Sequence, residues 1–479
     1  MLFNSLHFLI FFPIVTGLYF LLPHRFRWAW LLAASSYFYM AFIPAYVLIL
    51  YVTILIDYAA AILIERTEGV KRKRYLVLSI VANVGILFFF KYFNFFNSNI
   101  AELAQFLNWN YSIGALNIIL PVGLSFHTFQ AMSYTIEVYR GNQKAERHLG
   151  IYALYVMFFP QLVAGPIERP QNLLHQFYEK HRFDYKRVTD GLKLMGWGMF
   201  KKVVIADRLA VMVTKVYDNP YDFSGLTLLM ATYFFAFQIY CDFSGYSDIA
   251  RGSAKVLGIN LMKNFDRPYF AKSISEFWRR WHISLCTWFR DYIYIPLGGN
   301  RVGKWRWYFN IFIVFLISGL WHGAAWTYVS WGAILGIFMI CSVITRQLRQ
   351  KISNLLGISK HPLLVKIYTT MVTFHLIVFS WIFFRAKSIS DALYIVGSII
   401  SDANLKPSSI FIWQKVSLLA AFSGIIFLLI VQLVQRKHQI IEAFSNKHIL
   451  IRWAGYVALI WAIFMLGEFG GQQFIYFVF

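Results

Sequence analysis

Charged residues are scarce in this sequence. Only 14% of its 479 residues are Asp, Glu, Lys or Arg, while 59% are hydrophobic, and the mean hydropathy is +0.55. A soluble globular domain has about 25% charged and 45–50% apolar residues. The composition therefore excludes an ordinary soluble domain and predicts a protein that crosses the membrane many times.

Long polar tracts are also missing, and apolar runs recur along the whole chain. About ten or eleven of these runs approach the roughly 20 residues that a helix needs to cross a hydrocarbon core. They are continuous instead of alternating in polarity, which favours helices over a β-barrel. Because backbone groups in lipid must pair within their own segment, we expect an all-α polytopic membrane protein. The first run, within residues 1–28, lacks early basic residues and a cleavage site, and is expected to be a retained first span.

Acidic residues are few relative to basic ones, with 22 Asp and Glu against 45 Lys and Arg and a formal net charge of +23. In a soluble protein this excess would indicate a nucleic-acid partner. Here the basic clusters lie between apolar runs, at residues 71–74, 346–351 and 435–438. This arrangement is typical of cytoplasmic loops that face membrane lipids, so we expect lipid contacts and no nucleic acid.

Cysteines and soluble-enzyme motifs are rare as well. The three cysteines, Cys241, Cys286 and Cys341, show no C-x-x-C spacing, which argues against a metal site or disulfide framework. Residues 298–304 fit G-x-x-x-x-G-K, but Trp305 stands where a phosphate-binding loop needs Ser or Thr. Hydrolase, zinc-protease and dinucleotide signatures are missing too, so we expect no permanently bound cofactor and no metal.

No polar stretch is long enough to form an independent soluble domain, so residues 1–479 are expected to form one integral-membrane domain. Proline and glycine interrupt the apolar sequence twice, around residues 121–123 and 160–166. Non-helical backbone at membrane depth is tolerated only where it is packed in protein or lines a cavity. We therefore expect broken or re-entrant helices around a central depression.

Polar side chains gather near the end of one apolar run, at residues 238–248. Gln238 and Asp242 are the two that we select as candidate substrate-binding residues. Intramembrane carboxylates usually face a bundle interior or a wet cavity. The alternative is a helix that simply ends at the membrane interface.

Residues 272–305 are basic and dense in aromatic side chains. Ser273 and Glu276 have capping-box spacing, which predicts a helix start. One apolar stripe at helical spacing follows, made of Trp278, Trp281, Leu285 and Trp288. The pattern predicts a helix lying in the headgroup plane with its tryptophans pointing inward.

Three arginines of this region, Arg279, Arg280 and Arg290, are candidate substrate-binding residues. Guanidinium groups suit bidentate contacts with phosphate, so they could hold a phosphorylated donor. Basic residues at this level also commonly contact lipid phosphates, and composition alone favours that simpler interpretation.

One histidine lies deep in an uncharged run. No Asp, Glu, Lys or Arg stands between Arg306 and Arg346, which is too long a run for one span, so two segments are expected to meet near a break. His322 is flanked by Gly319 and Gly323 at a spacing that lets another helix approach closely. An ionisable residue at this depth is a candidate functional site, with a structural histidine as the alternative. Burial should keep it neutral and able to act as a base.

With these residues in hand, the sequence resembles the membrane-bound O-acyltransferases, in the branch that contains alginate and peptidoglycan O-acetylation proteins. The resemblance covers nearly the whole chain. It is carried by PVGLSFHTFQAMSYTIEVYRG (121–141), FFPQLVAGPIERP (158–170), QIYCDFSGYSDIARG (238–252), FWRRWHISLCTWFRDYIYIPLGGNR (277–301), SGLWHGAAWTYVSWG (318–332), WIFFRA (381–386) and FIYFVF (474–479).

This resemblance implies a ring of helices around a thin central region with a tunnel that joins the two sides of the membrane. It also implies that His322 is the family's signature catalytic histidine and that His282 occupies the second family position, as a further catalytic candidate. The implied activity is O-acetylation of an extracytoplasmic polysaccharide, with acetyl-CoA as donor and a periplasmic esterase-like protein as partner. The implied location is the bacterial cytoplasmic membrane.

Two other functions remain open on the sequence alone. A secondary transporter or flippase would also have broken helices, but it should show corresponding interruptions in two halves, and no such symmetry is visible. A scaffold that recruits a soluble acyltransferase would leave His322 structural. Transfer of labelled acetyl groups by the purified chain would separate these functions.

Overall fold

The computed structural model describes residues 1–402, 415–435, 440–469 and 474–475. Within these ranges the regular structure is entirely helical, with α-helices, short 3-10 turns and three π-helical turns, as the apolar sequence predicts. The chain divides into two compact units. Unit 1 comprises Met1–Met195 with Tyr246–Met262, and unit 2 comprises Gly196–Gly245 with Lys263–Phe479. The single domain expected over residues 1–479 stays a prediction.

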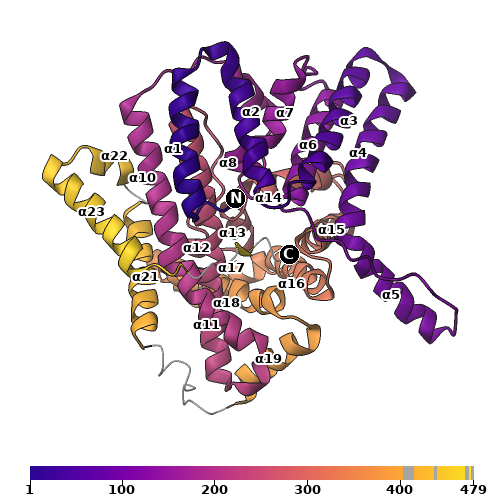
Figure 1. The fold of residues 1–479 in the computed structure, drawn as a ribbon. Helices are drawn as coiled ribbons and strands as arrows, with labels where there is room; N and C mark the ends of the chain where they lie inside the picture. The colour runs from indigo at the N-terminus through magenta and orange to yellow at the C-terminus, as the bar shows by residue number, and fades with distance from the viewer. Residues whose placement is uncertain (403–414, 436–439, 470–473, 476–479) are drawn as a thin grey trace. The chain divides into compact units, whose positions relative to one another are not determined.

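Unit 1 contains the helices of the first half of the chain (Figure 1). They are α1 (Leu6–Leu21), α2 (His24–Met40), α3 (Tyr46–Arg66), α4 (Gly69–Leu87), η1 (Phe88–Tyr92), α5 (Phe93–Phe106), α6 (Leu124–Arg140), α7 (Leu149–Met157), α8 (Phe159–Leu162), α9 (Pro170–Leu173) and η2 (Leu174–Phe177). Two further helices, α10 (Tyr185–Met199) and α12 (Gly225–Leu257), contribute residues to both units.

Unit 2 contains the helices of the second half and most of the candidate residues. They are η3 (Phe200–Ala206), α11 (Asp207–Asp218), η4 (Pro220–Asp222), η5 (Pro268–Phe270), α13 (Ile274–Arg280), α14 (Ile283–Phe289), η6 (Arg290–Tyr294), α15 (Lys304–His322), α16 (Trp326–Ile344), α17 (Arg346–Leu355), η7 (Ile358–Lys360), α18 (Pro362–Arg385), α19 (Ile389–Ser401), α21 (Lys415–Val434), α22 (Ile440–Ser445) and α23 (Ile449–Leu466).

Six helices in the described part of the chain are long and apolar enough to cross a membrane. They are Tyr46–Arg66, Gly69–Phe106, Gly225–Leu257, Trp326–Ile344, Pro362–Arg385 and Ile449–Leu466. Shorter apolar helices at Leu6–Leu21, Ile389–Ser401 and Leu418–Val434 follow the same composition. The polytopic helical class is confirmed, while the ten or eleven spans and their ring arrangement stay predictions.

The interior of unit 1 contains a buried carboxylate at membrane depth. Asp57 of α3 accepts hydrogen bonds from the Ser79 hydroxyl at 2.6 Å and from the Asn83 amide at 2.9 Å, both on α4. A buried polar group is tolerated when its hydrogen bonds are made, and here the bonds also fix the register of two neighbouring helices.

The interrupted segments of unit 1 are broken helices packed in protein, as their prolines and glycines predict. Gly123 has a φ of +77° and precedes α6, and a Cβ there would lie 2.9 Å from the carbonyl oxygen of Leu162. Residues 158–168, which contain α8 and the loop after it, are all buried. Only glycine combines this backbone conformation with so close an approach. The central depression stays a prediction.

Candidate functional site

His322 is the last residue of α15, and the chain turns at Gly323–Ala325 before α16 begins at Trp326. The two segments and the break expected in the uncharged run are thereby confirmed. The His322 side chain is buried, with 5% of the residue exposed. It lies against protein, as the glycines on either side of it predict.

The end of α15 is held by an unusually close approach of α16. A Cβ added at Gly319 would lie 2.3 Å from the carbonyl oxygen of Tyr328, and one added at Gly323 would lie 2.1 Å from the Tyr328 ring. Gly332 of α16 faces Gly319: the Cα of Gly332 lies 3.1 Å from the Cβ added at Gly319. The small-residue contact predicted from the spacing is confirmed, and it fixes the position of His322.

Aromatic rings surround the His322 imidazole. The ring centroids of Trp321, Trp331 and Phe384 lie 4.9, 5.0 and 5.5 Å away, and all three contacts are edge-on. These rings come from α15, α16 and α18, so three helices set the plane of the imidazole. An apolar lining lowers the local dielectric, which strengthens any electrostatic interaction made inside it.

His282 lies between two short helices, in a backbone conformation that is rare for residues other than glycine. Its φ of 43° and ψ of 54° are left-handed, and it separates α13 from α14. Asn264 supports the start of α14: its carbonyl oxygen accepts from the Ile283 N–H at 3.0 Å and its side-chain oxygen accepts from the Ser284 N–H at 3.1 Å. Strained backbone of this kind clusters at functional sites and persists only where the surroundings hold it.

The two candidate histidines share one aromatic neighbour. The Trp321 ring lies 4.9 Å from the His322 ring and 6.2 Å from the His282 ring, centroid to centroid. His282 is 1% exposed, and its ring also meets Phe243 of α12 edge-on at 4.6 Å. Burial lowers the pKa of His282 to about 3, so its ring is neutral at physiological pH. The structure thus brings both predicted catalytic residues to one aromatic cluster of unit 2.

The basic aromatic stretch differs from the single helix that its stripe predicts. The predicted start is confirmed, because the Ser273 hydroxyl accepts from the Glu276 N–H at 3.1 Å. The helix then ends at Arg280, and a second helix begins at Ile283. Trp281 in the break is 1% exposed and stacks on other rings of unit 2, so the tryptophans pack inside protein. The expectation of one continuous interfacial helix is therefore wrong at this point.

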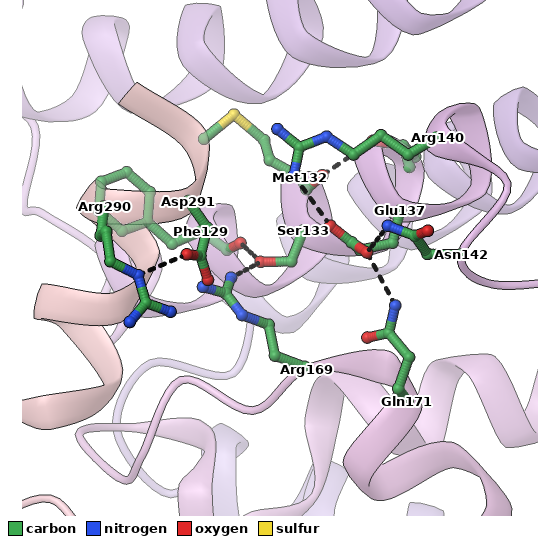
Figure 2. Close-up of polar contacts among 11 residues, drawn as sticks. Phe129, Met132, Ser133, Glu137, Arg140, Asn142, Arg169, Gln171, Arg290 and Asp291 are labelled. Atoms are coloured by element: carbon green, nitrogen blue, oxygen red, sulfur yellow. Dashed lines mark hydrogen bonds and ion pairs between the residues drawn. The ribbon is translucent and has the colours of Figure 1, made fainter. Parts of the chain in front are cut away.

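The three candidate arginines differ in their surroundings. Arg280 is half-buried, pairs with Glu276 at 2.6 Å and lies beside the carbonyl oxygen of Asp266. Arg290, at the start of the π-helical turn η6, is exposed and pairs with the neighbouring Asp291 at 2.7 Å (Figure 2). Arg279 is exposed at the end of α13. Arg279 and Arg290 are therefore the more accessible cations for a phosphorylated donor.

Gln238 and Asp242 lie one turn apart on α12, and both are buried. Asp242 is engaged within unit 2: one carboxylate oxygen lies 2.8 Å from the Lys202 ammonium, and the other accepts from the Ile475 N–H at 2.7 Å. These contacts make Asp242 part of the protein's internal framework, and its role in substrate binding stays a prediction. Gln238 stays a prediction.

Sequence analysis missed the buried lysines on η3. Lys202 lies between two carboxylates, with its ammonium 2.7 Å from Asp207 and 2.8 Å from Asp242. Burial alone would lower the pKa of Lys202, but Asp242 and Asp207 raise it above its ordinary value. The neighbouring Lys201 is 3% exposed and donates to the Ser244 hydroxyl at 2.9 Å. The available signal was two adjacent lysines inside an apolar run, followed by an aspartate five residues later.

A polar cluster in unit 1 was also missed (Figure 2). The Glu137 carboxylate of α6 accepts from the Asn142 and Gln171 amides, each at 2.9 Å, and pairs with Arg140 at 3.3 Å. Gln171 belongs to α9, so the cluster ties the end of α6 to the start of α9. Among the residues that the structure describes, no group of three His, Cys, Asp or Glu side chains could hold a metal ion.

Comparison with known proteins gives these positions a context. Residues 147–384 match the model of the MBOAT, or membrane-bound O-acyltransferase, family. The chain is 37% identical over 398 residues to the peptidoglycan O-acetyltransferase of Helicobacter pylori, covering 78% of this chain and 73% of that protein. It is 38% identical over 397 residues to a probable alginate O-acetylase of Pseudomonas aeruginosa, covering 82% and 73%.

A more distant relative is the teichoic acid D-alanyltransferase of Bacillus subtilis, 26% identical over 292 residues, which cover 57% of this chain and 70% of that protein. The family match contains α13 to α16 and therefore both candidate histidines. The resemblance inferred from the sequence is confirmed. The chain belongs to the membrane-bound O-acyltransferase family and is a multi-pass membrane O-acyltransferase.

Proposed function

We propose that this protein moves an acyl group, most simply acetyl, from a cytoplasmic thioester donor to the outer side of the bacterial inner membrane, for O-acetylation of a polysaccharide. Relatives named for alginate and for peptidoglycan support these two polymers as acceptor classes. Acetyl-CoA is the proposed donor. Its phosphates cannot enter hydrocarbon, so only the acyl end would reach the buried site.

The observation that carries this proposal is the position of His322, buried at the junction of α15 and α16 within a wall of aromatic rings. The imidazole removes the proton from an incoming hydroxyl while that oxygen attacks the thioester carbonyl carbon. The carbon–sulfur bond then breaks, and the proton held on His322 passes to the departing thiolate. General base catalysis of this kind contributes about 10²- to 10⁴-fold in rate.

His282 is proposed to act at the same site in its neutral form, since burial keeps its pKa far below neutrality. A neutral ring can accept or donate one hydrogen bond and so can orient the hydroxyl or the carbonyl group. The exposed guanidinium groups of Arg279 and Arg290 are proposed to hold the donor phosphates on the cytoplasmic side. The tunnel and the helical ring belong to this proposal, as does a periplasmic esterase-like partner that completes transfer to the polymer.

The test uses the purified full chain in lipid nanodiscs with acetyl-CoA labelled in the acetyl group. Release of free thiol and transfer of label to alginate oligosaccharides or peptidoglycan fragments are measured together. We expect the wild type to consume acetyl-CoA and His322→Ala to lose about 10²- to 10⁴-fold of that rate. His375→Ala is the matched control, because His375 is an exposed histidine on α18 whose Nδ1 bonds the carbonyl oxygen of Met371 in its own helix.

Each result bears on a distinct part of the proposal. A folded His322→Ala protein with the wild-type rate would end the assignment of the base. A wild type that consumes no acetyl-CoA would end the assignment of the donor. Thiol release with labelled free acetate as the product, and no label on either polymer when the periplasmic partner is added, would overturn transfer to the polysaccharide.

A further inference from the structure

A buried chain of contacts in unit 2 begins at Lys202 and ends at His282. It starts with the π-helical turn η3, in which the Asp207 N–H bonds to the carbonyl oxygen of Lys202, five residues earlier. This wider turn places the two side chains one above the other, and the Lys202 ammonium lies 2.7 Å from the Asp207 carboxylate. Single π-helical turns inside α-helices occur frequently at functional sites.

The second link joins Lys202 to α12. The ammonium lies 2.8 Å from Asp242. The backbones of α10 and α12 approach closely here, as a Cβ added at Gly245 would lie only 2.7 Å from the carbonyl oxygen of Gly198. Lys202 and Asp242 are 5% and 3% exposed. A buried carboxylate is held in place by a partner of opposite charge, and removing that partner leaves an uncompensated buried charge.

The third link joins Asp242 to a segment more than two hundred residues later in the chain. Its second carboxylate oxygen accepts from the Ile475 N–H at 2.7 Å, in a buried hydrogen bond. This bond secures the Phe474–Ile475 segment on α12, and the ring of Phe474, which is 1% exposed, packs against Phe243 at 5.9 Å. The remaining residues of the FIYFVF motif lie outside the described part of the chain.

The last link is the ring of Phe243, the residue after Asp242. It is fully buried and meets the His282 ring edge-on at 4.6 Å. His282 has a left-handed backbone, which the surrounding structure must hold in place. Phe474 and His282 therefore both contact the ring of Phe243.

We propose that Asp242, held by Lys202, is a positioning residue that secures the Phe474–Ile475 segment and thereby fixes the ring of His282. Asp242 acts through this segment and does not touch the reacting atoms. Phe474 and Ile475, the two described residues of the FIYFVF motif, then have a structural task, which is to hold the Phe243 ring against His282. This inference rests on the proposed function only in assigning His282 to the reaction.

The first experiment tests how firmly Asp242 holds the Phe474–Ile475 segment, without measuring activity. Ile475→Cys is placed in the full chain with Cys341→Ser, which removes the exposed native thiol, and maleimide labelling is followed in detergent micelles. We expect slow labelling in this background and faster labelling when Asp242→Asn is added, because the neutral side chain forms no ion pair with Lys202 and accepts from the Ile475 N–H more weakly than a carboxylate does. Asp190→Asn is the matched control, since Asp190 is a buried carboxylate of unit 1 that pairs with Lys193 at 3.2 Å.

The second experiment measures acetyl-CoA consumption by the full chain with native Ile475. We expect Asp242→Asn and Phe474→Ala each to lower kcat by about 10- to 100-fold with KM nearly unchanged, because misplacement of a group by about 1 Å can cost about 10²-fold. The double variant should lose no more than the stronger single variant, since both break one path. Lys202→Arg, which keeps the cation, should retain more activity than Lys202→Met.

The outcomes separate this inference from the proposed function. If His282→Ala has the wild-type rate, His282 is not part of the reaction and the proposed function loses that residue. If His282→Ala is impaired while folded Asp242→Asn keeps the wild-type kcat, the positioning inference alone is overturned. Unchanged labelling at position 475 in Asp242→Asn, or fully additive losses in the double variant, would overturn it as well.

Discussion

Two buried histidines, one in each unit, are held in different ways. In unit 1 the Nε2 atom of His127 lies 2.5 Å from the hydroxyl of Thr53, so a side chain on a neighbouring helix fixes the ring through one nitrogen. In unit 2 the ring of His322 is met edge-on by three aromatic rings at the point where its helix ends. Ring contacts of this kind fix the plane of an imidazole.

The bond to Thr53 makes His127 a link between two helices, whereas His322 is the residue to which the proposed function assigns chemistry. Both residues are almost fully buried, with 2% of His127 and 5% of His322 exposed, so burial alone does not distinguish them. The distinction lies in what each ring contacts and in where it stands along its helix. Experiments that measure stability and activity in the same variants test this distinction.

The largest expected effect is that changes at the two histidines alter different properties, activity in one case and stability in the other. His322→Gln should lower acyl transfer by about 10²- to 10⁴-fold, because a neutral amide cannot take up the proton. Thr53→Val should leave kcat within about twofold and lower the free energy of unfolding by about 1–3 kcal/mol, because it leaves the His127 nitrogen buried without its partner. Activity per folded molecule and equilibrium unfolding in mixed micelles provide the two measurements.

The comparison would fail if Thr53→Val impaired transfer as severely as His322→Gln in protein of equal folded content. It would also fail if both variants lost the same stability and neither lost activity. Either result would show that the surroundings of a buried imidazole do not report its role in this protein.

The setting of His322 could be predicted from the sequence because strong physical constraints act there. A run without charge that is too long for one span must break, and glycines four residues apart allow close helix packing. Both expectations hold, since Gly319 faces Gly332 of the next helix. The start of α13 at Ser273 was likewise predictable, because a capping box depends on local spacing alone.

The setting of His282 could not be predicted, because long-range contacts override a local pattern. The tryptophan stripe favours one helix, yet the chain breaks at Trp281 and His282, where the backbone of Asn264 takes over the hydrogen bond of the Ile283 N–H. The partner of Asp242 was missed for a similar reason. Lys202 lies forty residues earlier, and no spacing rule joins a lysine on a π-helical turn to a carboxylate on another helix.

A second prediction is that the buried imidazole of His282 makes the free energy of unfolding depend on pH. Burial lowers the pKa of His282 to about 3, whereas an imidazole in an unfolded chain has a pKa of about 6.5. The unfolded chain therefore binds the proton first as the pH falls. Stability should decrease below about pH 6.5 and continue to decrease toward pH 3, with a contribution of about 2 kcal/mol lost by pH 5.

The matched variant is His282→Asn, since asparagine tolerates the left-handed conformation and does not titrate in this range. Unfolding in mixed micelles at pH 8 and pH 5 should show a smaller loss of stability in this variant than in the wild type. Equal losses in the two proteins would mean that the His282 ring is protonated in the folded state, which contradicts its place among aromatic rings.

The smallest expected effect tests whether the helix before His282 has a task beyond its own stability. The Ser273 hydroxyl caps α13, and the Ser388 hydroxyl caps α19 in the same way, accepting from the Asp391 N–H at 3.0 Å. Loss of such a cap costs about 1 kcal/mol, so Ser273→Ala and Ser388→Ala should destabilise the protein equally. Only Ser273→Ala should also lower kcat, by a few-fold, because α13 leads directly into the strained backbone of His282. Equal kcat values in the two variants would mean that His282 is held by its ring contacts and by Asn264 alone, and would restrict the site of unit 2 to the aromatic cluster itself.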